Sequence, residues 1–590
     1  MLNYSLESLK FVKTYINYET LVYECNLMMN DYYVFNNEMD MERCSKPYKL
    51  NKSFKSPNGD GEWVYQISRM EFLHKFTLMY ALTNEEKYKN KFFDFLDFFY
   101  VNKGDGKSDN PKTMSLFKKL LGKIHIINKF TTFETNRTLD TSIRCYSILI
   151  DLQYFGYNAN SKIYNWIFDD IKRTENEIRD FDKVSNWGII ILSLCSTCRL
   201  IMDNNDIDDN INKLIAFLNN QINENGSHIE CSTMYQMNCL IALLRLIFWS
   251  SKRNIDLPIA IYDITKKMVK YMYYMSNDKG ILFQYGDSDA IDTNSIVYIA
   301  NFLFGGLNLP PKGNPRDYYF MMEFDFPFPE NFTTPKQHNY SLLFGGQWAC
   351  ETSLFSLRAF NEWSPSSHKH ADNGQVLLRF KGEDVLIDSG RYTYRNGNAR
   401  KAFRSPFYHN VFLVSGGGDW RFLSPNHFAN KPLIIGNKLS NSNSFKSIYY
   451  FDASKTTYAR TVLVKNEFVV IISECFKKGK QKMRSFWNIP IKFEQVTRDM
   501  IKTDNSLYLL FSNNIRFKKT KRSQRYNELE DSYRIVSDSY FDNYGLQICC
   551  LSNKRGYINI DHLNNVVKIM FGDSFVRFVK KNDEWVEFYS

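Results

Sequence analysis

Residues 307–336 read LNLPPKGNPRDYYFMMEFDFPFPENFTTPK, and the spacing of apolar residues differs on the two sides of this stretch. The stretch holds six of the fifteen prolines in the chain, in two runs at 307–320 and 325–336. Proline interrupts both helices and central strands, so these runs predict a linker between domains. A chain of 590 residues is also too long for one ordinary hydrophobic core, which favours two or three domains.

The residues before the linker carry helical patterns. Between Ser68 and Leu82 apolar residues recur every three positions, which predicts one amphipathic helix, and Thr83-Asn84 ends it. Similar patterns predict helices at 139–155, 161–178, 186–203, 208–222, 232–250 and 257–275. Helices of this length with short connections pair antiparallel, so we expect a toroid or solenoid of helical hairpins.

The residues after the linker carry strand patterns. In QVLLRF (375–380) the apolar residues Val376, Leu378 and Phe380 occupy alternate positions. Further runs of this kind are TVLVKNEFVVIISECF, SLYLLF, YGLQICCLS and VVKIMFGDSFVRFV. Short β-rich runs separated by Gly, Asn and Asp predict an antiparallel sandwich of one or two layers. The architecture is therefore an all-α half followed by an all-β half.

The net charge of the chain is +11, and it is concentrated in the second half. Residues 331–590 carry 38 Lys and Arg against 23 Asp and Glu, whereas residues 1–330 carry 37 against 41. A basic half is typical of proteins that bind a polyanion, although a solvated basic surface has the same composition. The chain has no helix-turn-helix, zinc-finger or aromatic β-sheet signature, so we expect no nucleic-acid partner.

Several compositional features bear on the compartment. No apolar run reaches membrane-spanning length, so we expect no membrane insertion. The N-terminal residues MLNYSLESLKFVKTYINYE are polar and lack a signal-peptide core, which predicts a cytoplasmic location by default and a periplasmic or secreted one if the N-terminus is trimmed. Eleven cysteines without CxxC pairs predict reduced, mostly buried thiols.

Histidine is scarce in this chain, yet two of its nine histidines lie close together in SSHKHADN, as His368 and His370. In a strand, positions two apart point to the same face, so both imidazoles are expected to enter one site. Asp388 closes the apolar run VLID, and His409 opens the run HNVFLV. Two histidines and an aspartate on adjacent strands suit a zinc-like ion, and a local hydrogen bond for each histidine is the competing interpretation.

The helical half offers two further candidate positions. Asn186, in VSNWGII, stands at the expected start of an apolar helix, where a plain N-cap role is also expected. The segment NENGSHIECSTMYQMNCL places His228, Glu230 and Tyr235 just before and within a helix. A tyrosine in a first helical turn can project into a cleft, and a buried core tyrosine is the competing interpretation.

These segments together resemble the heparinase II/III family of polysaccharide lyases. The similar segments are GEWVYQISRMEFLHKFTLMYALTNEEKYK within residues 60–90, RTLDTSIRCYS at 137–147, GSHIECSTMYQ at 226–236, SSHKHADNGQVLLRFKGEDVLIDSGRYTYRNG at 366–397 and FRSPFYHNVFLVSG at 403–416. The resemblance implies a multidomain α+β fold. It would have an N-terminal extension over 1–45 packed on the toroid, an (α/α) toroid over 46–325 and an antiparallel β-sandwich over 335–590.

The resemblance also implies an activity, which is β-elimination on a uronic-acid-containing polysaccharide of the glycosaminoglycan, heparan sulfate-like or exopolysaccharide type. Asn186 matches the residue that neutralises the uronate carboxylate, and Tyr235 matches the proton donor. His368 matches the catalytic histidine, and Tyr394 matches, less closely, a second tyrosine used as a base. In this scheme His368 or Tyr394 takes the C5 proton and Tyr235 protonates O4.

The remaining implied roles concern a metal and the substrate. The positions that hold a structural divalent metal in several members (zinc, or calcium or manganese) are His370, Asp388 and His409; no organic cofactor is implied. The candidate substrate-binding residues are Glu230, Trp187 and Arg404. Two departures from the family pattern, Gln236 and Trp187, stand where many members have histidine and bear on substrate choice.

Two other functions compete with this interpretation. One is a glycoside hydrolase on an (α/α) toroid, for which Glu230 and Asp182 are candidate acids without an evident second carboxylate. The other is a non-catalytic protein that binds or assembles polysaccharide. Both share the expected partner, an anionic polysaccharide, and the sequence predicts no oligomeric state.

Overall fold

The computed structural model describes residues 13, 16–37, 41–50, 54, 56, 59–102, 135–156, 162–324, 326, 339–414, 418–441, 443–490, 492–562 and 564–588. The chain divides into two compact units. Unit 1 comprises Met1–Gln221, Asn238–Lys266 and Asn294–Thr333, and unit 2 comprises Ile222–Met237, Lys267–Thr293 and Thr334–Ser590. Two segments from the helical half thus belong with the strands. Most of the second proline-rich run, 325 and 327–336, lies outside the described residues.

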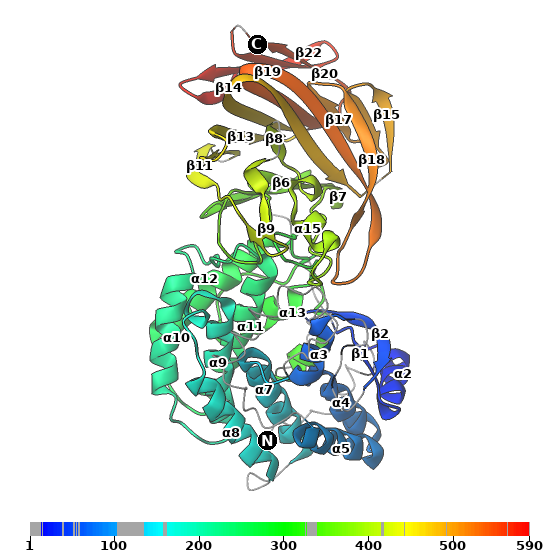
Figure 1. Ribbon diagram of the computed structural model, residues 1–590, viewed down its shortest axis with the longest axis vertical. Coiled ribbons are helices and arrows are strands. Elements are labelled where there is room, and N and C mark those ends of the chain that lie inside the picture. The colour runs from blue at the N-terminus through cyan, green and yellow to red at the C-terminus, as the bar shows by residue number, and fades with distance from the viewer. Residues whose placement is uncertain are drawn as a thin grey trace, which may run out of the picture. The chain divides into compact units, whose positions relative to one another are not determined.

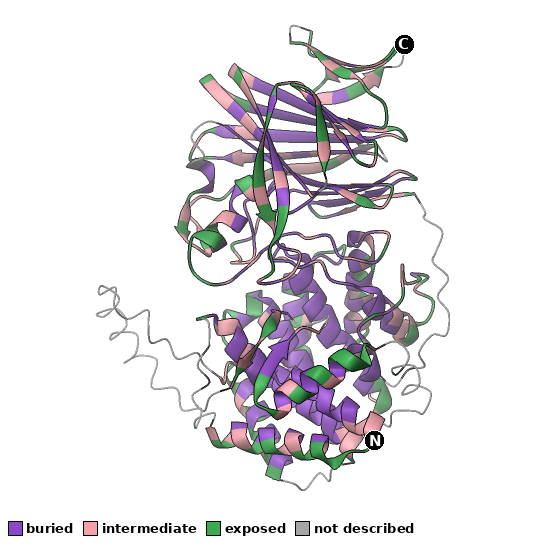
Figure 2. Ribbon diagram, turned by 90° about the vertical axis from the view of Figure 1, so that its right-hand side faces the viewer, coloured by how far each residue is buried: buried purple, intermediate pink, exposed green. Residues whose placement is uncertain are grey.

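Unit 1 is built of antiparallel helices (Figure 1). Its helices are α2 (Tyr18–Met29), α3 (Gly61–Arg69), α4 (His74–Thr83), α5 (Glu86–Asn102), α7 (Thr138–Phe155), α8 (Lys162–Asn176), α9 (Asn186–Ile201), α10 (Asp208–Gln221), α13 (Asn294–Phe304) and α14 (Tyr318–Met322), and it shares α11 (Thr233–Lys252) and α12 (Ile259–Met275) with unit 2. Helices α7 and α9 are buried over almost their whole length, whereas α8 and α10 bury one stripe. This inner and outer arrangement is that of an (α/α) toroid, as expected, and Figure 2 shows the buried inner helices.

The N-terminal residues pack on these helices. A short hairpin of β1 (Tyr32–Phe35) and β2 (Cys44–Lys49) follows α2. Glu24 pairs with Lys75 at 2.7 Å, and Glu42 pairs with Arg69 at 2.9 Å. All four side chains are buried, so the ion pairs join the hairpin region to α3 and α4.

The single helix predicted between Ser68 and Leu82 is in fact two. Helix α3 ends at Arg69, Met70 adopts a left-handed backbone with φ of 62°, and a 3-10 turn at Glu71–Leu73 leads into α4. A strict three-residue apolar spacing drifts around a helix of 3.6 residues per turn, so one straight helix cannot bury all of these side chains. The break at Met70 reorients the second half, and Met70 itself is completely buried.

Unit 2 holds three antiparallel sheets (Figure 1). The first contains β3 (Tyr340–Phe344), β4 (Gln347–Glu351), β5 (Phe355–Phe360), β6 (Gln375–Phe380) and β7 (Glu383–Leu386). The second contains β8 (Phe412–Val414), β11 (Leu433–Asn441), β12 (Ser444–Phe451), β13 (Thr456–Val464), β14 (Phe468–Ile489), β15 (Phe493–Thr497), β16 (Met500–Thr503), β17 (Tyr508–Phe511), β18 (Ile515–Arg522) and β19 (Glu530–Ser552). The third contains β20 (Tyr557–Asp561), β21 (Val566–Phe571), β22 (Ser574–Lys581) and β23 (Glu584–Phe588). Unit 2 also holds a small hairpin of β9 (Phe422–Ser424) and β10 (His427–Phe428) and the short helix α15 (Asn398–Arg404).

The large second sheet is buried on both faces, which makes the sandwich three layers deep rather than the one or two expected. On β14, Val469 and Ile471 join the core against the first sheet. Their neighbours Val470 and Ile472 join the core against the third sheet. Because side chains alternate across a strand, a continuous apolar run such as FVVII serves both cores.

Loops of unit 2 gather three segments that are distant in sequence. At the start of α11, the Ser232 hydroxyl donates to the Asp287 carbonyl at 2.7 Å, and the Thr233 hydroxyl donates to the Phe283 carbonyl at 2.9 Å. The Asp287 N–H donates to the His368 carbonyl at 2.9 Å. Gly286, with φ of +60°, allows this approach, because a Cβ there would lie 2.3 Å from the Cys231 oxygen.

The strand predicted for the two histidines is a loop. Residues between β5 and β6, including His368 and His370, form turns and bends rather than a ladder. Both imidazoles nevertheless reach one site, because the loop folds around a single carboxylate. Among the described residues, no helix is both long and apolar enough to cross a membrane.

Candidate active site

Three side chains singled out from the sequence meet within unit 2. Tyr235 lies in the first turn of α11, His368 in the β5–β6 loop and Tyr394 in the segment after β7. The His368 imidazole stacks on the Tyr235 ring, with 3.7 Å between centroids and 23° between planes. The hydroxyls of Tyr235 and Tyr394 are 2.6 Å apart, and the Tyr394 hydroxyl lies 3.5 Å from Nδ1 of His368. Three groups that can donate or accept protons are therefore adjacent.

Asp287 is the acceptor that organises this group. Its Oδ2 lies 3.0 Å from Nδ1 of His368, and its Oδ1 lies 2.7 Å from Nε2 of His370. Arg400 donates to both oxygens, from Nη1 at 2.5 Å and from Nη2 at 2.6 Å. Burial opposes ionisation, but the charge of Arg400 and the hydrogen bonds from both histidines hold the pKa of Asp287 well below its usual range. Asp287 is thus a buried anion that fixes both imidazoles.

The bond to Asp287 also sets the tautomer of His368. An ionised carboxylate only accepts hydrogen bonds, so Nδ1 of His368 carries the proton and Nε2 is the basic nitrogen. The His368 side chain is 16 % exposed, whereas Tyr235 is 4 % exposed. An imidazole that is oriented by a carboxylate and partly open to solvent can act as a general base.

Cationic side chains surround Tyr394. Nη1 of Arg391 donates to the Tyr394 hydroxyl at 3.1 Å, and the Arg400 guanidinium lies 4.8 Å from the Tyr394 ring centroid. Arg391 is itself held by Asp289, through bonds of 2.8 and 3.0 Å. The Tyr394 N–H donates to the Tyr526 hydroxyl at 3.0 Å. The Tyr394 hydroxyl therefore lies between a guanidinium donor and the Tyr235 hydroxyl, with which it can share a proton.

His370, Asp372 and His409 form a buried group whose ligand atoms lie within 4.8 Å of one another. Nδ1 of His370, Oδ2 of Asp372 and Nε2 of His409 have no hydrogen-bond partner among the described residues. The other ring nitrogens face carboxylates, Nε2 of His370 on Asp287 and Nδ1 of His409 on Asp388 at 2.8 Å. Two imidazoles and a carboxylate are a donor set that fits a divalent ion, and carboxylates commonly orient such imidazoles.

Asp388, expected as a metal ligand, hydrogen-bonds Nδ1 of His409, and the carboxylate that lies with the two imidazoles is that of Asp372. The ligand role of Asp388 stays a prediction. Lys369 is also fully buried, and its ammonium donates to Asp372. Burial lowers the pKa of Lys369 to about 8, which leaves the ammonium as the main form at pH 7. The donor atoms of His370, Asp372 and His409 fit a divalent ion. The positive charge of the Lys369 ammonium, bonded to Asp372, opposes a second cation there.

Arg404, expected to bind substrate, has a fully buried side chain. Nη1 donates to the Pro425 carbonyl and Nη2 to the Lys369 carbonyl, both at 2.6 Å, and these bonds support the loop that carries His368. Nε has no hydrogen-bond partner among the described residues, and the substrate role of Arg404 stays a prediction.

Gln236, where many family members have histidine, closes the loop before α11 with two hydrogen bonds. Gln236 accepts from the His228 N–H at 2.9 Å and donates to the Gly226 carbonyl at 2.5 Å. Nδ1 of His228 accepts from the Glu230 N–H at 3.2 Å. Burial, and then the charge of His368, lower the pKa of His228 to about 3, so it is neutral. Glu230 is buried at 4 % exposure, which places this candidate substrate ligand beneath the surface.

Asn186 and Trp187 lie in unit 1, at the start of α9. Asn186 is buried as the first helical residue, and Ser185 rather than Asn186 takes the N-cap position. Trp187 is half-buried, with the guanidinium groups of Arg137 and Arg179 at 5.2 and 5.5 Å from its ring. An aromatic ring beside two cations suits an anionic sugar.

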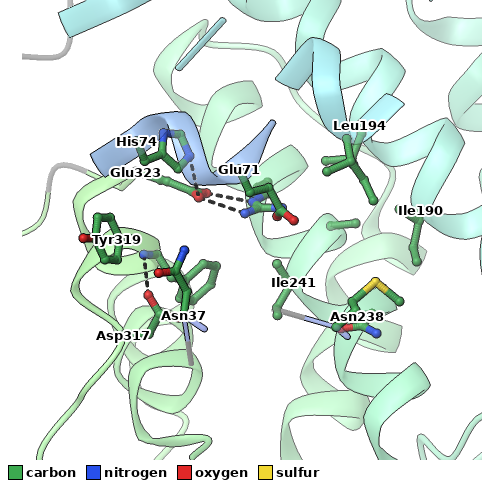
Figure 3. A pocket seen from close by; sticks show the side chains of 15 residues that line it. Asn37, Glu71, His74, Ile190, Leu194, Asn238, Ile241, Asp317, Tyr319 and Glu323 are labelled. Atoms are coloured by element: carbon green, nitrogen blue, oxygen red, sulfur yellow. Dashed lines mark hydrogen bonds and ion pairs between the residues drawn. The ribbon is translucent and has the colours of Figure 1, made fainter. Parts of the chain in front are cut away.

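Unit 1 also contains a small pocket, open to solvent, whose lining is shown in Figure 3. One wall is ionic, with Glu323 accepting from Arg245 at 2.7 and 2.8 Å and His74 lying 2.7 Å from Asp151. Burial opposes protonation of His74, but Asp151 and Glu323 raise its pKa to about 9. The Asn238 side-chain N–H group, on α11, has no partner among the described residues. The charges of Glu323, Arg245, His74 and Asp151 in this wall are paired with one another.

Sequence reasoning missed Asp287, Asp289, Arg391 and Arg400. The two aspartates stand in GDSD, a turn between helices that also reads as an ordinary polar loop. The arginines belong to RYTYRNGNARKAFR, where four arginines in fourteen residues were a usable signal of anion pairing. Their pairing with carboxylates about a hundred positions away in sequence could not be read from local spacing.

Comparisons with known proteins agree with this architecture. Residues 8–304 match the heparinase II/III N-terminus, and residues 357–550 match the heparinase II/III-like C-terminal domain. None of the curated proteins gives a significant sequence match. A crystal structure of heparinase III has a TM-score of 0.69 and 15 % identity, over 97 % of this chain and 91 % of that chain.

Two other lyase structures share the fold. A heparan sulfate lyase from Pedobacter heparinus has a TM-score of 0.58 and 15 % identity, over 97 % of this chain and 89 % of that chain. A chondroitin AC lyase from Streptomyces coelicolor A3 with chondroitin sulphate has a TM-score of 0.52 and 9 % identity, over 90 % and 82 %. The family matches together cover most of the sequence, so the chain belongs to the heparinase II/III family and is a polysaccharide lyase.

Proposed function

We propose that this lyase cleaves a uronic-acid-containing glycosaminoglycan by β-elimination, with Tyr235, His368 and Tyr394 as the catalytic residues. The observation that carries the proposal is the direct contact of these three side chains around Asp287. Elimination needs a base for the C5 proton and an acid for the departing O4 oxygen. One imidazole and two phenols within hydrogen-bond reach supply both.

The proton steps balance within this group. Nε2 of His368 takes the C5 proton, the C–H electron pair forms the C4–C5 double bond, and the C4–O4 bond breaks. Tyr235 gives its proton to the O4 oxygen. Tyr394, whose hydroxyl is 2.6 Å from that of Tyr235, then returns a proton to Tyr235. The Arg391 guanidinium stabilises the charge left on Tyr394.

We propose substrate-binding roles for Asn186 and Trp187 of unit 1 separately, because they match family positions of that kind. The C5 proton becomes acidic only when charge on the neighbouring carboxylate is stabilised, and a side-chain amide such as that of Asn186 can donate to it. Trp187 with Arg137 and Arg179 would hold a charged sugar ring. The similar structures named for heparan sulfate and chondroitin sulphate support a glycosaminoglycan as the substrate class.

Two carboxylates of the site, Asp287 and Asp289, are poorly suited to the acid role in hydrolysis. A hydrolase needs one carboxyl group that stays protonated, with a raised pKa. Asp287 is held ionised by Arg400, and Asp289 is held in a bidentate pair with Arg391. Neither is available as a general acid.

We assign a structural role to any cation held by His370, Asp372 and His409. When bound, a divalent ion there would supply charge that fixes the loop between β5 and β6. His370 reaches the catalytic group through Asp287. The cation would therefore act on the position of His368 and would not contact the sugar.

The experiment is an ultraviolet assay on a panel of polymers. Purified full-length protein is incubated with heparan sulfate, chondroitin sulfate and hyaluronan, and with keratan sulfate, which lacks uronic acid. The conjugated double bond of an elimination product absorbs in the ultraviolet, and hydrolysis produces no such band. We expect absorbance to rise with at least one uronate polymer and not with keratan sulfate.

Tyrosine variants provide the matched control. Tyr392 and Tyr394 are neighbours in RYTYR, but the Tyr392 ring packs on Phe403 with 5.3 Å between centroids. We expect Tyr235→Phe and Tyr394→Phe to lose about 10²-fold or more in kcat, while Tyr392→Phe retains it. Binding of a polymer without any product, in the unmodified protein, would support the non-catalytic alternative and contradict the proposal.

A further inference from the structure

The turn between strands β18 and β19, residues 523–527, is bonded to the segment after β7 that carries the second proposed catalytic tyrosine. The Ser523 N–H donates to the Ser389 carbonyl at 2.8 Å, and the Asn527 N–H donates to the Tyr392 carbonyl at 2.7 Å. Two backbone bonds therefore fix this segment to the β18–β19 turn, which comes from a distant part of the sequence.

The backbone of the same segment is strained at Tyr392. Its φ is 56°, in the left-handed region that a bulky residue rarely adopts. Gly390, with φ of +78°, permits the close approach of the turn, because a Cβ there would lie 2.0 Å from the Ser523 carbonyl oxygen. Strained conformations persist only where neighbouring contacts hold them, and they concentrate at functional sites. The β18–β19 turn supplies contacts of this kind on both sides of Tyr392.

Tyr526 is the residue of the turn that reaches the catalytic group. Its side chain is buried, and its hydroxyl accepts the Tyr394 N–H at 3.0 Å. The Tyr526 N–H donates to Oδ2 of Asp289 at 3.1 Å. Asp289 holds Arg391 in a bidentate pair, and Nη1 of Arg391 donates to the Tyr394 hydroxyl at 3.1 Å. Tyr526 therefore supports Tyr394 directly at the backbone, and it supports the Tyr394 hydroxyl through this ion pair.

We propose that Tyr526 is a positioning residue for the elimination, which holds the Tyr394 hydroxyl within proton-transfer distance of the Tyr235 hydroxyl. The inference rests on the proposed function, because Tyr526 acts through Tyr394. The two hydroxyls are 2.6 Å apart, and a displacement of about 1 Å in such a contact can cost about 10²-fold in rate. Loss of the Tyr526 oxygen leaves the Tyr394 N–H without this acceptor, so Tyr394 shifts and kcat falls.

The test compares two buried tyrosines whose hydroxyls accept a backbone N–H. Tyr526→Phe keeps the ring and removes the oxygen, and we expect kcat on a uronate polymer to fall about 10-fold with KM within about twofold. Tyr458→Phe is the matched control, because the buried Tyr458 hydroxyl accepts the Val414 N–H at 3.2 Å in the core of the sandwich. The control should lose at least as much free energy of unfolding in urea and keep its kcat. Kinetics are measured well below the Tm of each variant, so that loss of fold does not enter kcat.

A double variant separates positioning from a general effect on structure. In the Tyr394→Phe background, Tyr526→Phe should lower kcat by less than about twofold, since the hydroxyl that Tyr526 positions is already gone. An equal loss in both backgrounds would overturn the proposal. So would a Tyr526→Phe protein that keeps its kcat where Tyr394→Phe loses it, and this result would leave the proposed function standing. If Tyr394→Phe itself keeps its kcat, the proposed role of Tyr394 in elimination is wrong and the role of Tyr526 is wrong with it.

Discussion

Replacing Asp287 with asparagine removes one negative charge from the point where Arg400, His368 and His370 meet. The substitution keeps the size of the side chain, so no cavity forms. It also replaces one acceptor oxygen by an N–H donor that faces the donors of Arg400. The variant therefore leaves a guanidinium buried without its counter-charge.

The expected loss of stability follows from burial. Asp287 and Arg400 are both fully buried, and their contact is bidentate. Removal of one partner from a buried pair costs about 3–5 kcal/mol, because the other charge stays desolvated. Activity should fall by about 10²-fold or more, since His368 loses the carboxylate that sets its tautomer.

Urea unfolding at neutral pH, followed by tryptophan fluorescence, measures the first quantity, and the uronate assay measures the second. Glu474→Gln is the matched control, because Glu474 is buried and accepts from Lys580 at 2.8 Å and Tyr544 at 2.7 Å, in the core between the second and third sheets. We expect the control to lose stability and keep its kcat. The folded-state pKa of Asp287 lies below the unfolded value of about 3.9, so its contribution is present above that pH and is lost as pH falls.

If the free energy of unfolding of Asp287→Asn lies within about 1 kcal/mol of that of the unmodified protein, this reasoning is refuted. Loss of the Asp287 charge would then leave Arg400 without a measurable cost. Unchanged kcat in that variant would refute the orienting role separately.

Three further predictions concern other parts of the chain. The pKa of His74 is raised to about 9, above its unfolded value of about 6.5, so the pairing of His74 stabilises the fold fully below about pH 6.5. This stabilisation, on the order of 3 kcal/mol, is lost as pH rises through about 9. His74→Gln should remove this alkaline loss of stability, measured by urea titrations at several pH values. Gly286→Ala should lower the free energy of unfolding by more than about 1 kcal/mol, because the added Cβ would lie 2.3 Å from the Cys231 carbonyl oxygen and 2.8 Å from that of His368. Gly305→Ala is the control: its Cβ would have no atom within 4 Å, so its free energy of unfolding should fall less. Trp187→Ala should raise KM for a uronate polymer several-fold with a smaller effect on kcat, and an unchanged KM would remove Trp187 from substrate binding.

Local sequence patterns were enough for most of the secondary structure. The predicted helix at 232–250 is α11, Thr233–Lys252, and QVLLRF is strand β6. Patterns of this kind work because burial of one face acts within one element. They failed at Met70, where a left-handed residue that no propensity marks divides one expected helix into two.

The site was predictable only where one residue type is diagnostic. His368 and Tyr235 stood out from their motifs, and they do lie together. Asp287 did not stand out, because its partners His368, His370 and Arg400 lie 81, 83 and 113 positions away. The sequence around Asp287 gives no sign of these contacts. The sequence did not show that Asp372 lies with His370 and His409, since spacing places a carboxylate near a histidine without showing which ring nitrogen it faces.

The account depends on an elimination at the Tyr235, His368 and Tyr394 group, and heavy-oxygen water tests this directly. The protein is incubated with its uronate polymer in water enriched in oxygen-18, and the oligosaccharide products are weighed by mass spectrometry. We expect products that carry a double bond, lack one added water and contain no heavy oxygen, and we expect none of them from Tyr235→Phe. Products that have gained heavy oxygen at a new reducing end would show hydrolysis and contradict the account.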